Sequence, residues 1–311
     1  MGLDYNSTRI FAMTLGRRAI DDVRRDGLRQ LRNYVDMCAF LAKDPLARTF
    51  FDYAQTVLEQ PDPPYYIMTQ RLIRTVSENT LCTLGVNFGF GCMLYGSEKL
   101  AEAARQGLPA AWLTFSTSDD PELATEIEKA ESSGSYFWCL YLKGPLSTAL
   151  TELITRHPQS VFHLVIEPEY LTKSGAAELG KLPNVMPSVY LKSPSLTPAA
   201  REAFTLLSEH HTFQTAFLHL DASQLEEAFQ SAWLEELARY TPACVFSRKA
   251  GMPEDASEDL RRRIWSDRLK ADGQLFLIDL ESDLTVISSH MPMQVSTRVR
   301  PIISPDMPMY H

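Results

Sequence analysis

The polar side chains with the best potential for chemistry directly follow short apolar runs in the second part of the chain. They combine carboxylates with lysines and one histidine: Asp119, Lys143, Glu167, Lys192, His219, Asp221, Asp279 and Glu281. Beside them stand Thr117, Ser118, Ser247, Arg248 and His290. If the apolar runs are parallel strands of an α/β barrel, these groups gather at one end, which is the working end of such barrels. We therefore take them as candidate ligand-binding residues, with a possible small-molecule ligand at the barrel mouth. The plainer alternative is that strand ends are polar because they meet water.

A metal site is the most specific chemistry that this set allows. His219 and Asp221 lie two residues apart at the end of an apolar run, a spacing that can place both on one side of a strand. With Asp279, Glu281 and His290 they could form a histidine–carboxylate centre. Nothing in the local spacing enforces it, and no metal or catalytic residue is predicted.

The remaining histidines and the cysteines favour structural roles. His210 and His211 fit the C-terminal end of a helix, where a cation is favoured, and His157 and His163 fit the interior. The cysteines are scattered at positions 38, 82, 92, 139 and 244 and form no Cys-x2-Cys pair. They suit core packing and a reducing compartment, so we expect a cytoplasmic protein.

Two patterns of apolar residues divide the chain. Residues 1–108 show helical spacing throughout, for example over residues 9–42, 46–58 and 67–75, and predict an all-helical N-terminal region. Residues 109–290 alternate strand-like runs with helical segments. The expected strands are residues 111–116, 135–142, 161–166, 185–191, 213–220, 243–247, 275–280 and 284–289. We count about six of these as parallel barrel strands, fewer than the eight of a full barrel, which predicts an α/β fold, a partial (β/α)6 barrel resembling part of a TIM barrel.

Charge and composition narrow the possible partners. The net charge of −9 disfavours nucleic-acid binding, which needs a basic face, and no apolar run is long enough to cross a membrane. Residues 291–311 are rich in proline and methionine and have no period, so we expect an extended tail that contacts the domain or a partner.

The order of these segments resembles a branch of the radical S-adenosylmethionine enzymes that has a helical region before a partial (β/α)6 barrel. The resemblance is spread over LYGSEKLAEAARQGLPAAWLTF, GSYFWCLYLKGPL, LPNVMPSVYLKS and RRRIWSDRLKADGQLFLIDLESD. It implies the same fold. In that family, cysteines spaced Cys-x3-Cys-x2-Cys after the first barrel strand bind a four-iron cluster, and a Gly-Gly-Glu-Pro turn after the second strand holds the cofactor.

This chain departs from the family pattern at each of those places. No cysteine lies between Ala111 and Phe137, and the turn after the second strand reads Leu142-Lys143-Gly144-Pro145. After the third strand stands Glu167-Pro168-Glu169, where the family has a polar turn. Ser288, Ser289 and His290 occur where this branch often has glycines and cysteines. Serine and aspartate do not replace thiolates at such a cluster.

The resemblance and its departures together imply a degenerate barrel without the iron–sulfur cluster and without a cofactor. Such a pseudoenzyme would act as a partner, scaffold or substrate-carrying subunit for an active enzyme, in a complex with another protein or as a homo-oligomer. Two alternatives remain open: an enzyme that uses the Asp/Glu/His/Lys rim for new chemistry, and a small-molecule binding protein. The strand ends discriminate between the pseudoenzyme and the enzyme, because an enzyme needs the rim side chains to converge on an open site that apolar side chains do not plug.

Overall fold

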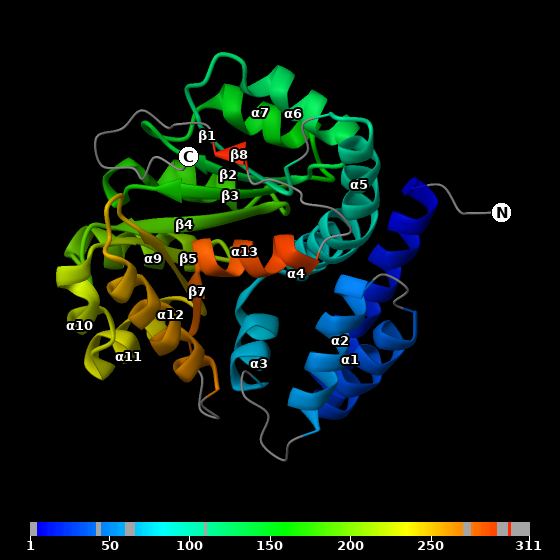
Figure 1. Ribbon diagram of the computed structural model, residues 1–311, viewed down its shortest axis with the longest axis horizontal. Helices are drawn as coiled ribbons and strands as arrows, with labels where there is room; N and C mark the ends of the chain where they lie inside the picture. Colours follow the sequence, from blue (N-terminus) through cyan, green and yellow to red (C-terminus); the bar gives the residue numbers. More distant parts are fainter. Residues whose placement is uncertain are drawn as a thin grey trace.

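The fold is a curled half-barrel of parallel strands preceded by a helical region (Figure 1). A computed structural model describes residues 5–41, 45–59, 66–108, 111–269, 275–290 and 298–299. The α/β half-barrel confirms the predicted fold class. Within the described residues, no helix is both long enough and apolar enough to span a bilayer.

The helical region is built from α1 (Tyr5–Leu41), α2 (Pro45–Leu58), α3 (Tyr66–Thr75), α4 (Glu78–Val86) and α5 (Ser97–Arg105). Helix α1 is kinked at Gly27, whose φ of 55° lies in the left-handed region. Between α4 and α5 the chain forms a π-helix, η1 (Asn87–Gly96). The helical spacing of residues 1–108 predicts helix there as well, and the three glycines of this segment are the signal that the helix is irregular.

Seven consecutive strands form the half-barrel: β1 (Leu113–Thr117), β2 (Phe137–Tyr141), β3 (Val161–Ile166), β4 (Val185–Leu191), β5 (Thr215–Leu220), β6 (Ala243–Arg248) and β7 (Phe276–Asp279). Each pairs in parallel with its neighbours in chain order. A two-residue strand, β8 (Arg298–Val299), lies beside β1 on its free edge. The predicted extended tail otherwise falls on residues 291–297 and 300–311, which lie outside the described residues.

Helices on the outer side of the sheet follow the strands in turn: α6 (Leu123–Ser133), α7 (Thr148–Arg156), α8 (Lys173–Leu179), α9 (Pro198–Glu209), α10 (Leu225–Ala228), α11 (Ser231–Tyr240) and α12 (Glu254–Arg268). Hydroxyl side chains begin several of them. The Ser147 hydroxyl accepts from the Leu150 N–H at 3.2 Å, and Thr197 accepts from Ala200 at 3.1 Å. Short turns η2 (Pro168–Tyr170) and η3 (Ala222–Gln224) follow β3 and β5.

The predicted strand over residues 284–289 is wrong: these residues belong to helix α13 (Leu280–His290). The local chemistry explains the helix. The Asp279 carboxylate accepts a hydrogen bond from the Ser282 N–H at 3.2 Å, which is the position of an N-cap. Glu281 and Asp283 follow in the first turn, where the helix dipole favours carboxylates.

Two apolar cores lie on opposite faces of the sheet. The outer core packs strand residues such as Trp138, Leu164 and Phe246 against the outer helices. The inner core fills the concave face with Phe115, Tyr141 and other buried side chains, against which η1, α5 and α13 pack. Strand β3 is buried along its whole length because it contributes to both cores.

Candidate functional site

The turn between β1 and α6 occupies the place where the family resemblance would put cluster-binding cysteines. It is closed by Asp120, whose carboxylate accepts from the Ser116 hydroxyl at 3.0 Å and from the Glu122 N–H at 2.9 Å. Ser118 joins this turn to the next strand end by accepting from the Lys143 N–H at 3.1 Å. The turn is therefore held by oxygen and nitrogen groups of the chain itself, and the sequence has no cysteine there.

The predicted ligand-binding residues do lie along the carboxyl ends of the strands, but they do not converge on one point. Asp119 and Lys143 are exposed at the ends of β1 and β2. Glu167, after β3, pairs with Lys192, after β4, at 3.1 Å. The hydrogen bond and charge of Glu167 raise the pKa of Lys192.

Asp221 is engaged in two local interactions after β5. Its carboxylate caps the turn η3 by accepting from the Ser223 N–H at 3.0 Å, and it pairs with Lys249 at 3.1 Å. A hydrogen bond from the Ser223 hydroxyl, followed by the Lys249 pair, lowers the pKa of Asp221. Asp221 therefore acts as a capping residue in this structure.

The ends of β6 and β7 are joined by a compact group of charges around Arg248. Its guanidinium donates to the buried Asp279 carboxylate at 2.6 Å and to the Ser282 hydroxyl at 2.5 Å. Glu281 accepts from the Ser247 hydroxyl at 2.9 Å and from the Arg248 N–H at 3.1 Å. The group fixes the start of α13 against β6, because both carboxylates belong to the β7–α13 junction.

His219 faces the concave side of the sheet among aromatic rings. It is 1% exposed, and its ring lies 6.3 Å from Tyr141, 5.6 Å from Tyr190 and 5.2 Å from Phe217, measured between ring centres. The predicted pairing of His219 with Asp221 in a metal site is not favoured, since Asp221 is held by Ser223 and Lys249. Within the described residues, no three histidine, cysteine or acidic side chains are arranged to hold a metal ion. The side chain of His290 lies outside the described residues.

A buried polar chain that the sequence interpretation missed crosses the same concave face. His163 contacts the Cys139 thiol at 3.7 Å through Nδ1 and the Thr215 hydroxyl at 3.3 Å through Nε2. Thr215 in turn donates to the Ser188 hydroxyl at 2.9 Å. Burial lowers the pKa of His163 to about 4, so its ring is neutral at pH 7. The sequence did carry a signal for this chain of polar groups. Side chains alternate between the two faces of a strand, and this alternation within β2 to β5 places these residues on the inward-facing positions.

Helix α13 covers the concave face near the rim. Leu280, Leu284 and Ile287 are partly buried and pack against the inner core, on the same face as Met186 and Tyr190. Figure 1 shows α13 lying across the open side of the half-barrel, between β5–β7 and the helical region. The helix contacts β6, β7 and α2. The mouth of the half-barrel is thus lined by apolar side chains from a segment predicted to be a strand.

The remaining cysteines lie on separate elements of the fold. Cys82 contacts the Met13 carbonyl at 3.3 Å, Cys92 is buried in η1, and Cys244 belongs to the outer core. Burial raises the pKa of Cys92, Cys139 and Cys244, which keeps each of them a thiol at neutral pH. These environments suit packing, as the sequence indicated.

Comparison of the sequence with models of known protein families gives no match, and the curated proteins contain no significant match either.

Proposed function

We propose that this chain is a non-catalytic relative of the radical S-adenosylmethionine half-barrels. It would act as a partner, scaffold or substrate-carrying subunit of an active enzyme. One observation carries the proposal: the apolar side chains of α13 pack onto the concave face, where an active half-barrel needs an open site. The closed β1–α6 turn and the missing cysteines give it further support.

The charges at the rim also favour a structural role over new chemistry. Glu167, Asp221 and Asp279 are each paired with a cation, which neutralises the groups that a repurposed enzyme would use. Catalytic constellations instead bring titratable groups together around a reacting atom. An enzyme with rim chemistry is therefore the less favoured function.

Apolar side chains exposed on the helical region are consistent with a binding surface for a protein. Ile10 and Phe11 on α1 are 66% and 58% exposed, and Phe40, Tyr53 and Ile67 are exposed as well. Large exposed apolar groups mark association surfaces when they gather on one region. We place this role in the cytoplasm, because the cysteines are free thiols.

Anaerobic reconstitution with iron and sulfide tests whether the half-barrel has lost its cluster. We expect a colourless protein with no iron or sulfide retained after gel filtration. About four irons and four sulfides per chain, with broad brown absorbance, would overturn the proposal. In that event Cys82, Cys92 and Cys139 would be the first ligands to substitute.

A further inference from the structure

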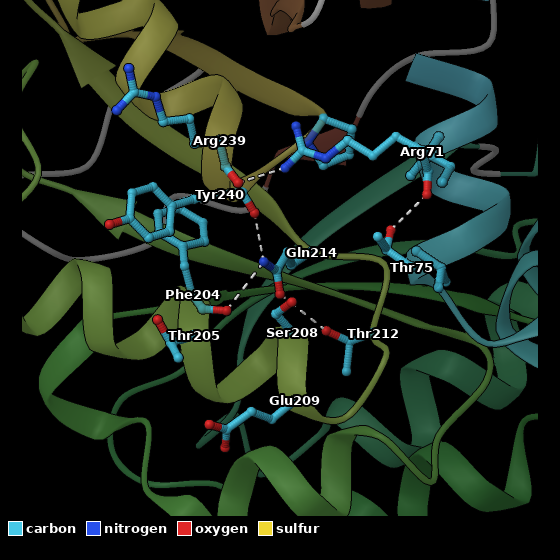
Figure 2. Close-up of a pocket in the computed structure, with 13 residues that line it drawn as sticks. Arg71, Thr75, Phe204, Thr205, Ser208, Glu209, Thr212, Gln214, Arg239 and Tyr240 are labelled. Carbon is cyan, nitrogen blue, oxygen red and sulfur yellow. Dashed lines mark hydrogen bonds between the residues drawn. The ribbon is translucent and has the colours of Figure 1, made fainter. Parts of the chain in front are cut away.

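A cavity of about 280 Å³ lies at the edge of the sheet opposite the rim. Its walls come from the end of α3, from α9 and α11, and from the loops that lead into β5 and β6. Figure 2 shows Arg71 and Thr75 on one side of the cavity and Phe204, Thr205 and Tyr240 on the other. The cavity therefore spans the boundary between the helical region and the half-barrel.

Arg71 supplies a half-buried positive charge at this cavity. Its guanidinium donates to the main-chain carbonyls of Ala238 and Arg239, the latter at 2.7 Å. Burial lowers the pKa of Arg71, although a guanidinium stays charged at neutral pH. Within the described part of the chain, no carboxylate forms an ion pair with Arg71. The Arg239 side chain extends away from Arg71 in Figure 2, so Arg71 is the cation best placed for a ligand.

Gln214 supplies an acceptor at the floor of the cavity. It is 6% exposed, and its amide nitrogen donates to the carbonyls of Phe204 at 3.2 Å and Tyr240 at 2.7 Å. Its amide oxygen faces the Thr212 hydroxyl at 3.5 Å, but that hydroxyl lies closer, at 3.1 Å, to the Leu207 carbonyl. A hydroxyl has one proton to donate, so the Gln214 oxygen retains the capacity to accept from a ligand.

The cavity wall and its size suit an apolar body about as large as one ring. The partly buried Tyr240 ring lines one side, backed at 5.8 Å between ring centres by the fully buried Phe204, and Leu72 and Val76 line the facing side. A cavity of about 150 Å³ is sufficient to bind benzene. The observed volume therefore leaves room for a ring together with polar substituents.

We propose that this cavity binds a small organic carboxylate that carries a ring-sized apolar body and a hydroxyl or amino group. The carboxylate would face Arg71, the ring would pack against Tyr240 and Leu72, and the donor would reach the Gln214 oxygen. Such a ligand would bridge α3 to α9 and α11. This site is separate from the rim and does not depend on the proposed partner role.

Calorimetric titration of the full chain tests the ligand class. The ligands to use are 4-hydroxybenzoate and 4-hydroxyphenylacetate, with 4-hydroxybenzamide as the neutral counterpart. We expect one-site binding of at least one carboxylate with a Kd below about 1 mM. Because a charged hydrogen bond is lost, the amide should bind at least about tenfold more weakly. The proposal is overturned if neither carboxylate saturates the protein or if the amide binds equally well.

Three variants test the location of the site. Ser208→Phe on α9 fills the cavity from an exposed position and should abolish binding. Arg71→Gln should weaken carboxylate binding at least about tenfold. Arg74→Gln, an exposed arginine of the same helix that does not line the cavity, is the matched control and should leave binding unchanged. If Arg71→Gln does not fold, as judged by circular dichroism, Ser208→Phe decides: unaltered binding in that variant would contradict the assignment.

Discussion

Arg248 at the rim of the half-barrel joins the end of β6 to the start of α13. Its partner Asp279 is almost completely buried, with 2% of the side chain exposed, and the same carboxylate caps α13. Lys192 and Glu167 form a pair of the same type with 66% and 38% of their side chains exposed. The loss of stability on breaking a charge pair depends on burial. When the pair is buried, removal of one partner leaves the other charge unpaired in a low-dielectric environment. The two pairs therefore provide a direct comparison.

Asp279→Ala should lower the free energy of unfolding by about 3 kcal/mol, because it leaves Arg248 without its buried carboxylate and removes the helix cap. Lys192→Ala should cost less than about 1 kcal/mol, since solvent screens the exposed pair. Urea unfolding of both variants measures the difference. Equal losses would show that the Arg248 group does not anchor α13.

His163 makes the stability of the fold dependent on pH. Its pKa is about 4 in the folded chain, below the ordinary value of 6.5, because burial disfavours the charged ring. Between these values the unfolded chain binds more protons than the folded chain, so stability must fall as pH decreases from about 6.5 toward 4. From pH 7 to pH 5, this histidine should cost about 2 kcal/mol.

Urea unfolding at pH 7 and pH 5 checks this expectation, with His163→Gln as the variant that removes the titrating ring. The drop in stability between the two pH values should be smaller in the variant by about 2 kcal/mol. An identical drop in both proteins would contradict the expectation, because it would mean that folding does not change the pKa of His163.

Helix α13 is the element that covers the concave face near the rim. Its apolar residues Leu280, Leu284 and Ile287 pack against the inner core, whereas Val286 on the same helix is exposed. The helix belongs to the same chain as the face it covers, so the cover is present whether or not a partner binds. The residues that follow β7 thus place apolar side chains of α13 on the concave face of the half-barrel.

Leu284→Ala should destabilise the protein by about 1 to 2 kcal/mol, because it removes partly buried contacts with the inner core. Amide hydrogen exchange over residues 280–287 should accelerate in this variant. Val286→Ala is the matched control and should change stability by less than about 0.5 kcal/mol, with exchange unchanged. Equal exchange in both variants would contradict the packing of α13 on the sheet.

The sequence identified the elements with strong local signals and missed those set by tertiary context. Strands such as Val161–Ile166 were predictable because continuous burial requires a continuous apolar run. The run over residues 284–289 is too short to distinguish a strand from a helix by periodicity. The acids Asp279, Glu281 and Asp283 before it were the available signal for a helix N-terminus.

The candidate sites also depend on tertiary contacts that the sequence does not show. Strand-end residues such as Glu167 and Lys192 were located by the strand pattern, but their pairing depends on how neighbouring strands align. The cavity beside Arg71 was not predictable, because Arg71 meets the Arg239 carbonyl across 168 residues of sequence. Such long-range contacts follow from the packing of α3 on α11 and produce no pattern in the local sequence.

The two ends of the half-barrel differ in how their side chains are packed. The rim and concave face of the half-barrel are filled by paired charges and by α13, whereas the opposite edge holds a cavity with a buried acceptor and a cation. The helical region adds exposed apolar side chains on α1. This distribution is the basis on which we propose a role in binding other molecules.

The mass of the full chain in solution, with anything bound to it, tests the proposed partner role most directly. The chain should be purified from its own cells at low expression and measured by light scattering. We predict a stoichiometric assembly with a second protein or a second copy. Phe11→Asp should dissociate it by placing a charge on the exposed apolar part of α1, whereas Trp265→Asp, at an exposed residue of α12, should leave it intact. A protein with the mass of one chain at every concentration, and without a bound protein, would contradict the partner role.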